Sequence, residues 1–308
     1  MSEQSTQRRA GAPGRLAVLK TYKLYLAGKF PRSESGRVYE VVDGKGGWLA
    51  NAPLASRKDA RDAVAAARKA LPGWSGATAY HRGQVLFRVA EMLQGRRAQF
   101  VAEVTAAERL SAARAAASVD AAIDRLVWYA GWTDKIAQLA GGPNPVAGPF
   151  LNLSTPEPTG VVAVLAPQRS SLLGLVSVLA PVLAGGGTAV VVAAQEAPLP
   201  ALSFAEVLAT SDVPGGVVNM LSGRTAELAP PLAAHRDVNA LDVTGALGDP
   251  ELVREVEQAA AENLKRVFRP GSAMAEGSGD SDAWLAAPGT ERLLAFLETK
   301  TVWHPRGD

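Results

Sequence analysis

The chain has 308 residues, of which 47% are hydrophobic, values that are ordinary for a soluble globular protein of one large or two smaller domains. Its 32 basic and 30 acidic residues give a formal net charge of +2, which provides no electrostatic reason to expect nucleic acid or an anionic membrane as a partner. The absence of cysteine excludes disulfides, cysteine-ligated metal centres and a thiolate nucleophile, and the three histidines are too scattered for a metal-binding motif.

The N-terminal part predicts a tail that is followed by strands and a layer of helices. Residues 1–20 are polar and lack the apolar segment of a secretion signal, so we expect a disordered tail and a cytoplasmic protein. In the region 21–140, apolar–polar alternation indicates strands first, and helical patterns follow. Ser56 and Asp59 have the spacing of a capping box at the start of a helix. Two further helical segments are expected at 80–104 and 112–139.

A second region alternates short apolar strands with helices. The Gly- and Pro-containing segment 141–159 leads into it and includes the extended stretch "FLNLSTPEP". Over 160–268 the alternation indicates βαβ units and a parallel sheet covered on both faces. The segment from Ser170 to Gln195 carries no charge, which raises the question of a membrane span, but Pro181 and three consecutive glycines divide it into a helix and a strand. We therefore expect an α/β fold with a doubly wound parallel sheet and no membrane segment.

The C-terminal part predicts a connector and a closing strand. Residues 269–290 are rich in Gly, Ser, Ala and Asp, a composition typical of a flexible linker. Residues 291–308 combine a short helix with the β-like end "FLETKTVWHP". Such a strand is unstable alone, and the natural partner for it within this chain is the segment Phe150–Pro156.

The same regions carry a colinear series of short motifs. It includes "LYLAGKF", "PEPTGVVAVLAP", "LAGGGTAVV", "VPGGVVNMLSG" and "ENLKRV". In this order, over about residues 22–267, the series resembles the cofactor-binding region of the NAD(P)-dependent aldehyde dehydrogenase superfamily. The resemblance implies a Rossmann-like cofactor domain, NAD(P) as cofactor, and a small β element for oligomerisation to which 141–159 and 291–308 correspond.

The family's catalytic and ribose-binding residues are replaced at the matching positions. The family ends its first cofactor-domain strand in Pro-Trp-Asn, whose Asn stabilises an oxyanion. Here the matching residues are Pro167, Gln168 and Arg169, so no catalytic residue is expected. The family's ribose-binding Lys and Glu fall on Val192 and Gln195, and valine has no donor for a hydroxyl or a phosphate.

The pyrophosphate positions of the family are altered as well. Thr225 and Ala229 match glycines, and a Cβ there blocks close approach of the backbone to phosphate. The family's Gly-Ser turn becomes Gly245-Ala246, and no G-x-G-x-x-G or Walker A sequence replaces these elements. NAD(P) binding is therefore expected to be weak or lost. The weak remnant of the cofactor site consists of Pro167, Gln195, Gly223 and Gly245.

Two further departures concern Arg169 and the end of the cofactor region. Arg169 can bind an anion at a helix N-terminus or lie on the surface, and the surface interpretation is favoured. After "NLKRV" the family continues into Glu-Leu-Gly-Gly, which supplies the general base, and then into a domain that bears the nucleophilic Cys. Here Phe268 to Gly271 and the linker follow instead, so the catalytic domain is expected to be missing.

These observations leave three hypotheses. The first is a pseudoenzyme, a non-catalytic structural or regulatory subunit that forms a homodimer or a heteromer with a full-length aldehyde dehydrogenase. The second is an NAD(P)-linked oxidoreductase acting on aldehydes with catalytic residues supplied by a partner chain. The third is a degraded remnant without a role.

Overall fold

The computed structural model describes residues 18–271 and 281–306, so most of the predicted tail lies outside the described residues. A five-stranded parallel sheet forms the centre of the molecule, in the order β7–β6–β5–β8–β9, which confirms the predicted α/β fold. The strands are β5 (Val161–Leu165), β6 (Thr188–Val192), β7 (Val218–Leu221), β8 (Ala240–Asp242) and β9 (Arg266–Phe268).

Helices cover both faces of this sheet. In β5, Val162 and Val164 belong to one core cluster, and Val161, Ala163 and Leu165 belong to another, so the strand is apolar on both sides. Such two-sided burial is typical of parallel strands. The first cluster is covered by α6 (Leu173–Ala184) and α7 (Leu199–Ala209). The second is covered by α1 (Arg57–Ser75), α8 (Thr225–Ala234) and α9 (Pro250–Ala261).

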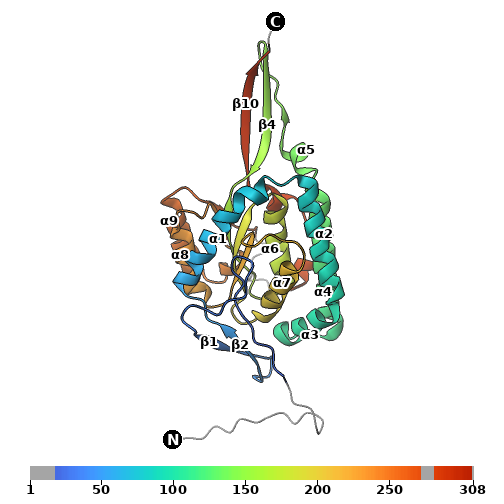
Figure 1. Ribbon diagram of the computed structural model, residues 1–308, viewed down its shortest axis with the longest axis vertical. Coiled ribbons are helices and arrows are strands. Elements are labelled where there is room, and N and C mark those ends of the chain that lie inside the picture. The colour runs from blue at the N-terminus through green and yellow to red at the C-terminus, as the bar shows by residue number, and fades with distance from the viewer. Residues whose placement is uncertain (1–17, 272–280, 307–308) are drawn as a thin grey trace, which may run out of the picture.

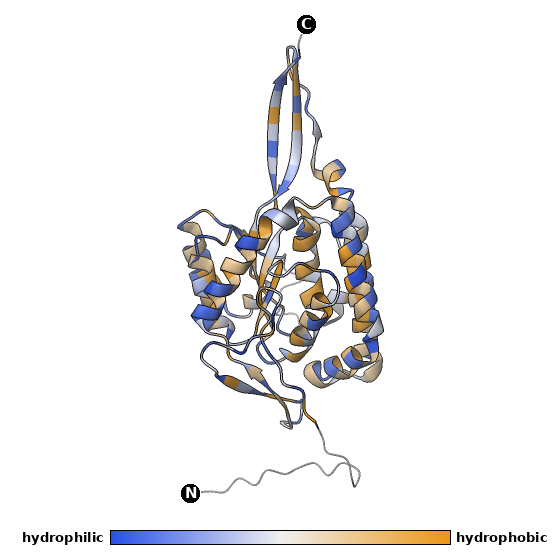
Figure 2. Cartoon of the chain, in the orientation of Figure 1, coloured by the Kyte–Doolittle hydropathy of each residue, from blue (hydrophilic) through white to orange (hydrophobic). Residues whose placement is uncertain are grey.

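Helix α6 is apolar on all sides because it lies inside the molecule. A helical layer of α2 (Ala79–Gly95), α3 (Arg97–Glu108) and α4 (Ala112–Trp132) stands beyond it, and the apolar colouring of α6 contrasts with the mixed colouring of α2 and α4 (Figure 2). All residues of α6 are buried, as expected for a helix between two layers. Over the described residues, no helix has the length and hydropathy needed to cross a membrane.

The N-terminal elements agree with the sequence except that the helices expected over 80–104 and 112–139 are each divided, the second after Trp132. The side chain of Ser56 accepts hydrogen bonds from Lys58 N and Asp59 N, and Asp59 Oδ2 accepts from Ser56 N at 2.8 Å, so the predicted capping box of α1 is confirmed. Strands β1 (Val38–Val42) and β2 (Trp48–Pro53) form a separate two-stranded sheet. The helix expected over 80–104 is divided at Arg96 into α2 and α3, because Arg96 leaves helical geometry at φ −107° and ψ 13°.

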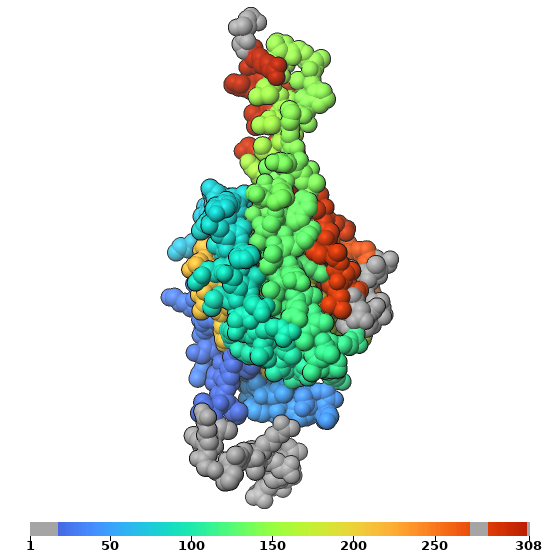
Figure 3. Space-filling model, turned by 90° about the vertical axis from the view of Figure 1, so that its right-hand side faces the viewer, coloured from blue at the N-terminus to red at the C-terminus, as the bar shows by residue number. Residues whose placement is uncertain are grey.

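A three-stranded sheet projects from the body, and we call it the stalk (Figures 1 and 3). It consists of β3 (Gly142–Pro143), β4 (Phe150–Pro158) and β10 (Leu297–Pro305), in the order β10–β4–β3. β10 pairs antiparallel with the whole of β4, from Leu297 opposite Pro158 to Pro305 opposite Phe150. The predicted pairing of the two segments is confirmed. The short helix α5 (Ile136–Ala140) leads from the helical layer into the stalk.

The segment that precedes β10 is packed against the body. It contains the 3₁₀ helix η3 (Ser281–Leu285) and the helix α10 (Glu291–Ala295). Trp284 is 7% exposed and belongs to the core cluster that α6 covers. The described C-terminal half of the predicted linker 269–290 therefore differs from a flexible connector, because an aromatic side chain anchors it. The remainder, 272–280, lies outside the described residues.

Candidate functional site

The candidate site lies where the order of the sheet reverses. The chain passes from β5 outward to β6 and β7, and then crosses to β8 on the other side of β5. In doubly wound sheets a ligand binds in the crevice at the carboxyl ends of the strands that flank this reversal. In this chain the segments at that position are residues 166–169, which follow β5, and the 3₁₀ helix η1 (Thr244–Ala246), which follows β8.

These two segments touch through their backbones. A Cβ at Gly245 would lie 2.0 Å from the carbonyl oxygen of Ala166, so only glycine allows the contact. Pro167 is buried, and a Cβ at Gly174 on α6 would lie 3.0 Å from its ring. Pro167 and Gly245, two residues of the predicted cofactor remnant, therefore pack the ends of β5 and β8 together.

Gln168 and Arg169 have different positions. Gln168 Nε2 donates to Ala166 O at 2.9 Å, and Gln168 Oε1 accepts from Gln195 N at 2.8 Å, so this side chain joins the ends of β5 and β6. The side chain of Arg169 is exposed. An exposed position is what the surface interpretation of Arg169 expects, and that interpretation stays a prediction.

The N-terminus of α6 is capped by a carboxylate that the sequence did not single out. Glu108, at the end of α3, accepts hydrogen bonds from both the backbone nitrogen and the hydroxyl of Ser171, each at 2.7 Å. Burial raises the pKa of the Glu108 carboxyl, and the hydrogen bonds from Ser171 and from the backbone of Leu172 oppose that shift. The position where a helix dipole would attract an external anion is thus taken by the chain's own carboxylate.

The N-terminus of α8 is capped in a similar way. Gln195 Oε1 accepts from Thr225 N at 3.3 Å, and Gln195 Nε2 donates to Glu196 Oε1 at 3.2 Å. The hydroxyl of Thr225 is buried and makes no hydrogen bond among the described residues. Val192 is fully buried in β6 and offers no polar atom. Gly223 keeps a φ of +151°, but Thr225 places a side chain where close approach of a pyrophosphate would need a glycine.

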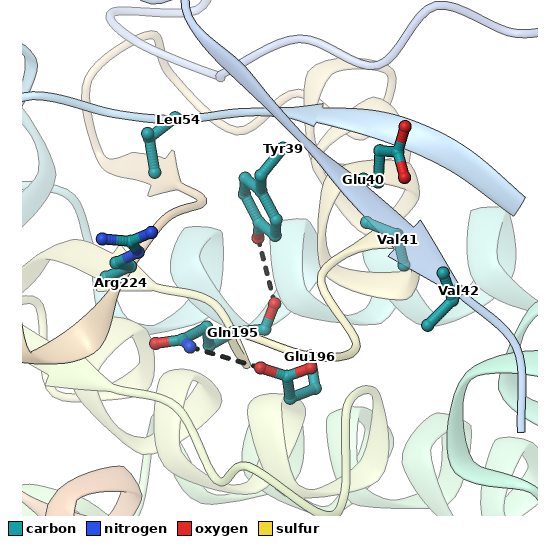
Figure 4. Close-up of a pocket in the computed structure, with 8 residues that line it drawn as sticks. All are labelled: Tyr39, Glu40, Val41, Val42, Leu54, Gln195, Glu196 and Arg224. Carbon is teal, nitrogen blue, oxygen red and sulfur yellow. Dashed lines mark hydrogen bonds between the residues drawn. The ribbon is translucent and has the colours of Figure 1, made fainter. Parts of the chain in front are cut away.

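A small pocket remains beside this capped helix (Figure 4). Its volume is about 210 Å³, and its lining includes Tyr39, Gln195, Glu196 and Arg224. Tyr39 closes it from the side of β1 by donating its hydroxyl to Gln195 O at 3.1 Å. Burial, and then the charge of Glu196, raise the pKa of Tyr39, so the phenol stays protonated and remains a donor. Pockets for drug-sized ligands and cofactors hold roughly 300–1,000 Å³, so this one is too small for a dinucleotide.

Two buried arginines hold the segment before β10 against the carboxyl end of β8. Arg292 of α10 forms an ion pair with Asp242 and donates to the hydroxyl of Thr244 at 3.0 Å. Arg125 of α4 donates to the carbonyl oxygens of Trp284 and Ala286, each at 2.8 Å. Side chains far apart in the sequence therefore stabilise the edge of the candidate site, and no local pattern in the sequence indicated it.

A metal centre has no support in the described part of the chain. No group of three or more His, Asp or Glu side chains is placed there to hold an ion. The features brought together at the carboxyl ends of the strands are therefore the side chain of Gln168, the capped N-termini of α6 and α8, and the buried ion pair of Arg292 with Asp242. None of these supplies an activated nucleophile with an adjacent base.

The sequence profile described as "Aldehyde dehydrogenase family" matches residues 30–273. Among curated proteins, the chain is 32% identical over 264 residues to cytosolic 10-formyltetrahydrofolate dehydrogenase of Mus musculus, covering 82% of this chain and 28% of that protein. It is 31% identical over 253 residues to a hydroxybutyrolactone dehydrogenase of Acinetobacter baylyi, covering 81% of this chain and 50% of that protein. The chain thus spans half or less of the length of these relatives.

Solved structures also match this chain over about half of their own length. PnpE from Pseudomonas sp. WBC-3 superimposes with a TM-score of 0.76 at 28% identity, over 80% of this chain and 50% of that one. An aldehyde dehydrogenase from Bacillus cereus, solved as an NAD+ complex, gives 0.74 at 26% identity over 80% of this chain and 50% of its own length. The relatives therefore share the fold of the described body and extend well beyond it.

Proposed function

Because the chain belongs to the aldehyde dehydrogenase family, we propose that it is a non-catalytic structural or regulatory subunit of an aldehyde dehydrogenase assembly. The stalk is the observation that carries this proposal. It projects from the body and exposes large apolar side chains on both faces, with Leu153 and Val302 on one face and Trp303 on the other. Large apolar side chains that are exposed together on one small element favour an interaction site.

The outer edge of β10 also favours assembly. β10 is an edge strand whose one neighbour among the described residues is β4. Its second row of backbone donors and acceptors is therefore open to a strand of another subunit. A homodimer satisfies this geometry, and the partner that we prefer is a full-length aldehyde dehydrogenase, because solved members of that family share the fold of this body.

The residues at the crevice support a role without aldehyde oxidation by this chain alone. The sequence has no cysteine to act as the family's nucleophile, and the exposed Arg169 stands at the position of the family's oxyanion-binding Asn. Gln195 and Glu108 occupy the two helix N-termini that face the crevice. The relative from B. cereus binds NAD+, but the residues of this chain do not fit the pyrophosphate, so we infer that dinucleotide binding is weak or lost.

The assembly is tested by light scattering of the intact chain, alone and mixed with a full-length aldehyde dehydrogenase from the same organism. The double variant Val302→Ser/Trp303→Ser removes two exposed apolar side chains of β10. Its control is Val38→Ser, which removes an exposed apolar side chain from β1 and leaves the stalk intact. Point variants are preferable to a truncation at residue 291, which would remove the buried Arg292.

We expect the stalk variant to lose the assembly, with a mass close to that of one chain, and the control to retain it. Equal masses for the two variants would assign assembly to another surface. The alternative is a cofactor-binding subunit whose catalytic residues are supplied by the partner. It would be favoured if mixing the two proteins increased aldehyde oxidation and if this chain bound NAD(P) at micromolar concentration.

A cytoplasmic location belongs to the same proposal. Several relatives carry the word cytosolic in their names, among them cytosolic aldehyde dehydrogenase 1 of Elephantulus edwardii, which is 30% identical over 250 residues. The lack of cysteine agrees with a location in which disulfides are not needed. This location can be tested by fractionating cells that express the tagged chain. Recovery of the chain in the membrane pellet would contradict it.

A further inference from the structure

A second pocket lies at the opposite end of the sheet, by the amino ends of β5, β8 and β9. Its volume is about 390 Å³, larger than the pocket beside α8. The polar and charged side chains that define it are Thr159, Arg236, Asn239, Asn263, Lys265 and Arg266. Glu298 contributes the carboxylate among the lining residues, so three cations face one anion and a surplus of two positive charges remains.

The negative charge is already engaged. Glu298 forms an ion pair with Arg266 at 2.9 Å and accepts from the hydroxyl of Thr159 at 3.2 Å. The remaining cations, Arg236 and Lys265, form no ion pair with a carboxylate within the described residues. The surplus therefore rests on these two side chains and not on Arg266.

Lys265 is held inside the pocket wall. It is 9% exposed, and its ammonium donates to Asn263 Oδ1 at 2.5 Å. An ammonium has three donors, so two remain for other acceptors. Burial lowers the pKa of Lys265, and an anion beside it would oppose that shift by stabilising the ammonium.

The amide of Asn239 is fixed by its neighbours. Its Oδ1 accepts from Val161 N at 3.0 Å and from Arg68 Nη2 at 2.7 Å, and a Cβ at Gly160 would lie 2.2 Å from this oxygen. The oxygen of the amide is thus committed, and the amide nitrogen of this pocket-lining residue remains available as a donor. Neutral and cationic donors that surround one polar pocket are suited to an anion with several acceptor oxygens.

Further charged groups lie beside the pocket lining. Burial lowers the pKa of the neighbouring His235, the carboxylate of Asp237 opposes that shift, and the charges of Lys265, Arg61 and Arg68 add to it. Cations from α1 and from the turn before β9 therefore converge on the same edge of the sheet. A phosphate dianion matches the surplus of two positive charges, and it can accept from all the available donors.

We propose that this pocket binds a small phosphate, either the inorganic ion or a phosphate monoester, through Arg236, Lys265 and the amide of Asn239. The site lies at the opposite end of the sheet from the crevice, so it does not depend on the function proposed above. It also lies at the base of the stalk, because Thr159 follows β4 and Glu298 lies in β10.

The test is calorimetric titration of the intact protein with inorganic phosphate, and in a second arm with glycerol 3-phosphate, at constant ionic strength maintained by chloride. The variant Arg236→Gln removes an exposed cation that makes no ion pair in the described structure, and Lys265→Gln removes the buried one. The control Lys300→Gln removes the same charge from the stalk, where Lys300 pairs with Glu157 at 2.9 Å.

We expect saturable binding to one site, about tenfold or more weaker in Arg236→Gln and Lys265→Gln because each loses a charge-assisted hydrogen bond, and unchanged in Lys300→Gln. Tighter binding of the ester or of the inorganic ion identifies the source of the phosphate. The proposal is overturned if neither ligand binds saturably, or if Arg236→Gln and Lys300→Gln bind equally. Arg236→Gln keeps the test decisive if the Lys265 variant does not fold.

Discussion

Replacement of Arg292 by Met should destabilise the fold severely. The ion pair between Arg292 and Asp242 has side-chain exposures of 8% and 0%, so the carboxylate would be left without its cation inside the core. Removing one partner of a buried pair costs about 3–5 kcal/mol. Met keeps an apolar side chain of similar length beside Phe268, over whose ring the guanidinium lies at 4.7 Å from the centroid, so the loss is assigned to the interactions of the guanidinium with Asp242, Thr244 and this ring.

Urea unfolding followed by tryptophan fluorescence measures this free energy. The matched control is Arg269→Met, whose pairing with Glu257 at 3.5 Å involves side chains that are 57% and 39% exposed. Exposed pairs contribute about 0–1 kcal/mol. The double variant Arg292→Met/Asp242→Asn removes both charges and should recover part of the loss. If Arg292→Met costs no more than Arg269→Met, the pair does not hold the C-terminal segment as described.

Three further outcomes are expected. Burial raises the pKa of Glu108 above its usual 4.5. The contribution of Glu108 to the free energy of unfolding is therefore complete below pH 4.5 and is lost as the pH rises through the folded-state pKa. Glu108→Gln should remove this pH dependence in urea unfolding measured between about pH 4 and 7. Gly245→Ala brings a Cβ against Ala166 O and should cost about 1–3 kcal/mol, whereas Gly248→Ala, with open space around its Cβ, should change the free energy of unfolding little. In calorimetry, NAD+ should bind about a hundredfold or more weakly than to a full-length relative, because two charge-assisted hydrogen bonds at the ribose are missing; equal affinities would contradict the interpretation of Gln195.

The parts of the fold that local patterns encode were predicted well. The strands of the parallel sheet are apolar on both faces and stand out as short apolar runs, as in Val161–Leu165. The capping box needs only Ser56 and Asp59, three positions apart. The partner of β10 followed from the need of any strand for a neighbour, and β4 was an extended segment of suitable length.

The contacts at the candidate site could not be predicted in this way. Glu108 caps a helix 63 positions further along the chain, and Arg292 reaches an aspartate 50 positions before it. Such pairs depend on how the layers pack, and no spacing rule relates their members. The segment around Trp284 was interpreted from its Gly- and Ser-rich composition, which conceals the effect of a single buried aromatic residue.

The way in which Arg125 holds the C-terminal segment has a consequence for sequence variation. Its guanidinium donates to the main-chain oxygens of Trp284 and Ala286 and to the hydroxyl of Ser177. Main-chain oxygens are present whatever the side chain, so these hydrogen bonds recognise the path of the segment, and Trp284 is the side chain that anchors it. Position 286 can therefore be substituted freely as long as that path is kept, whereas Arg125 itself should tolerate no replacement, including lysine, whose ammonium lacks the planar fork of donors.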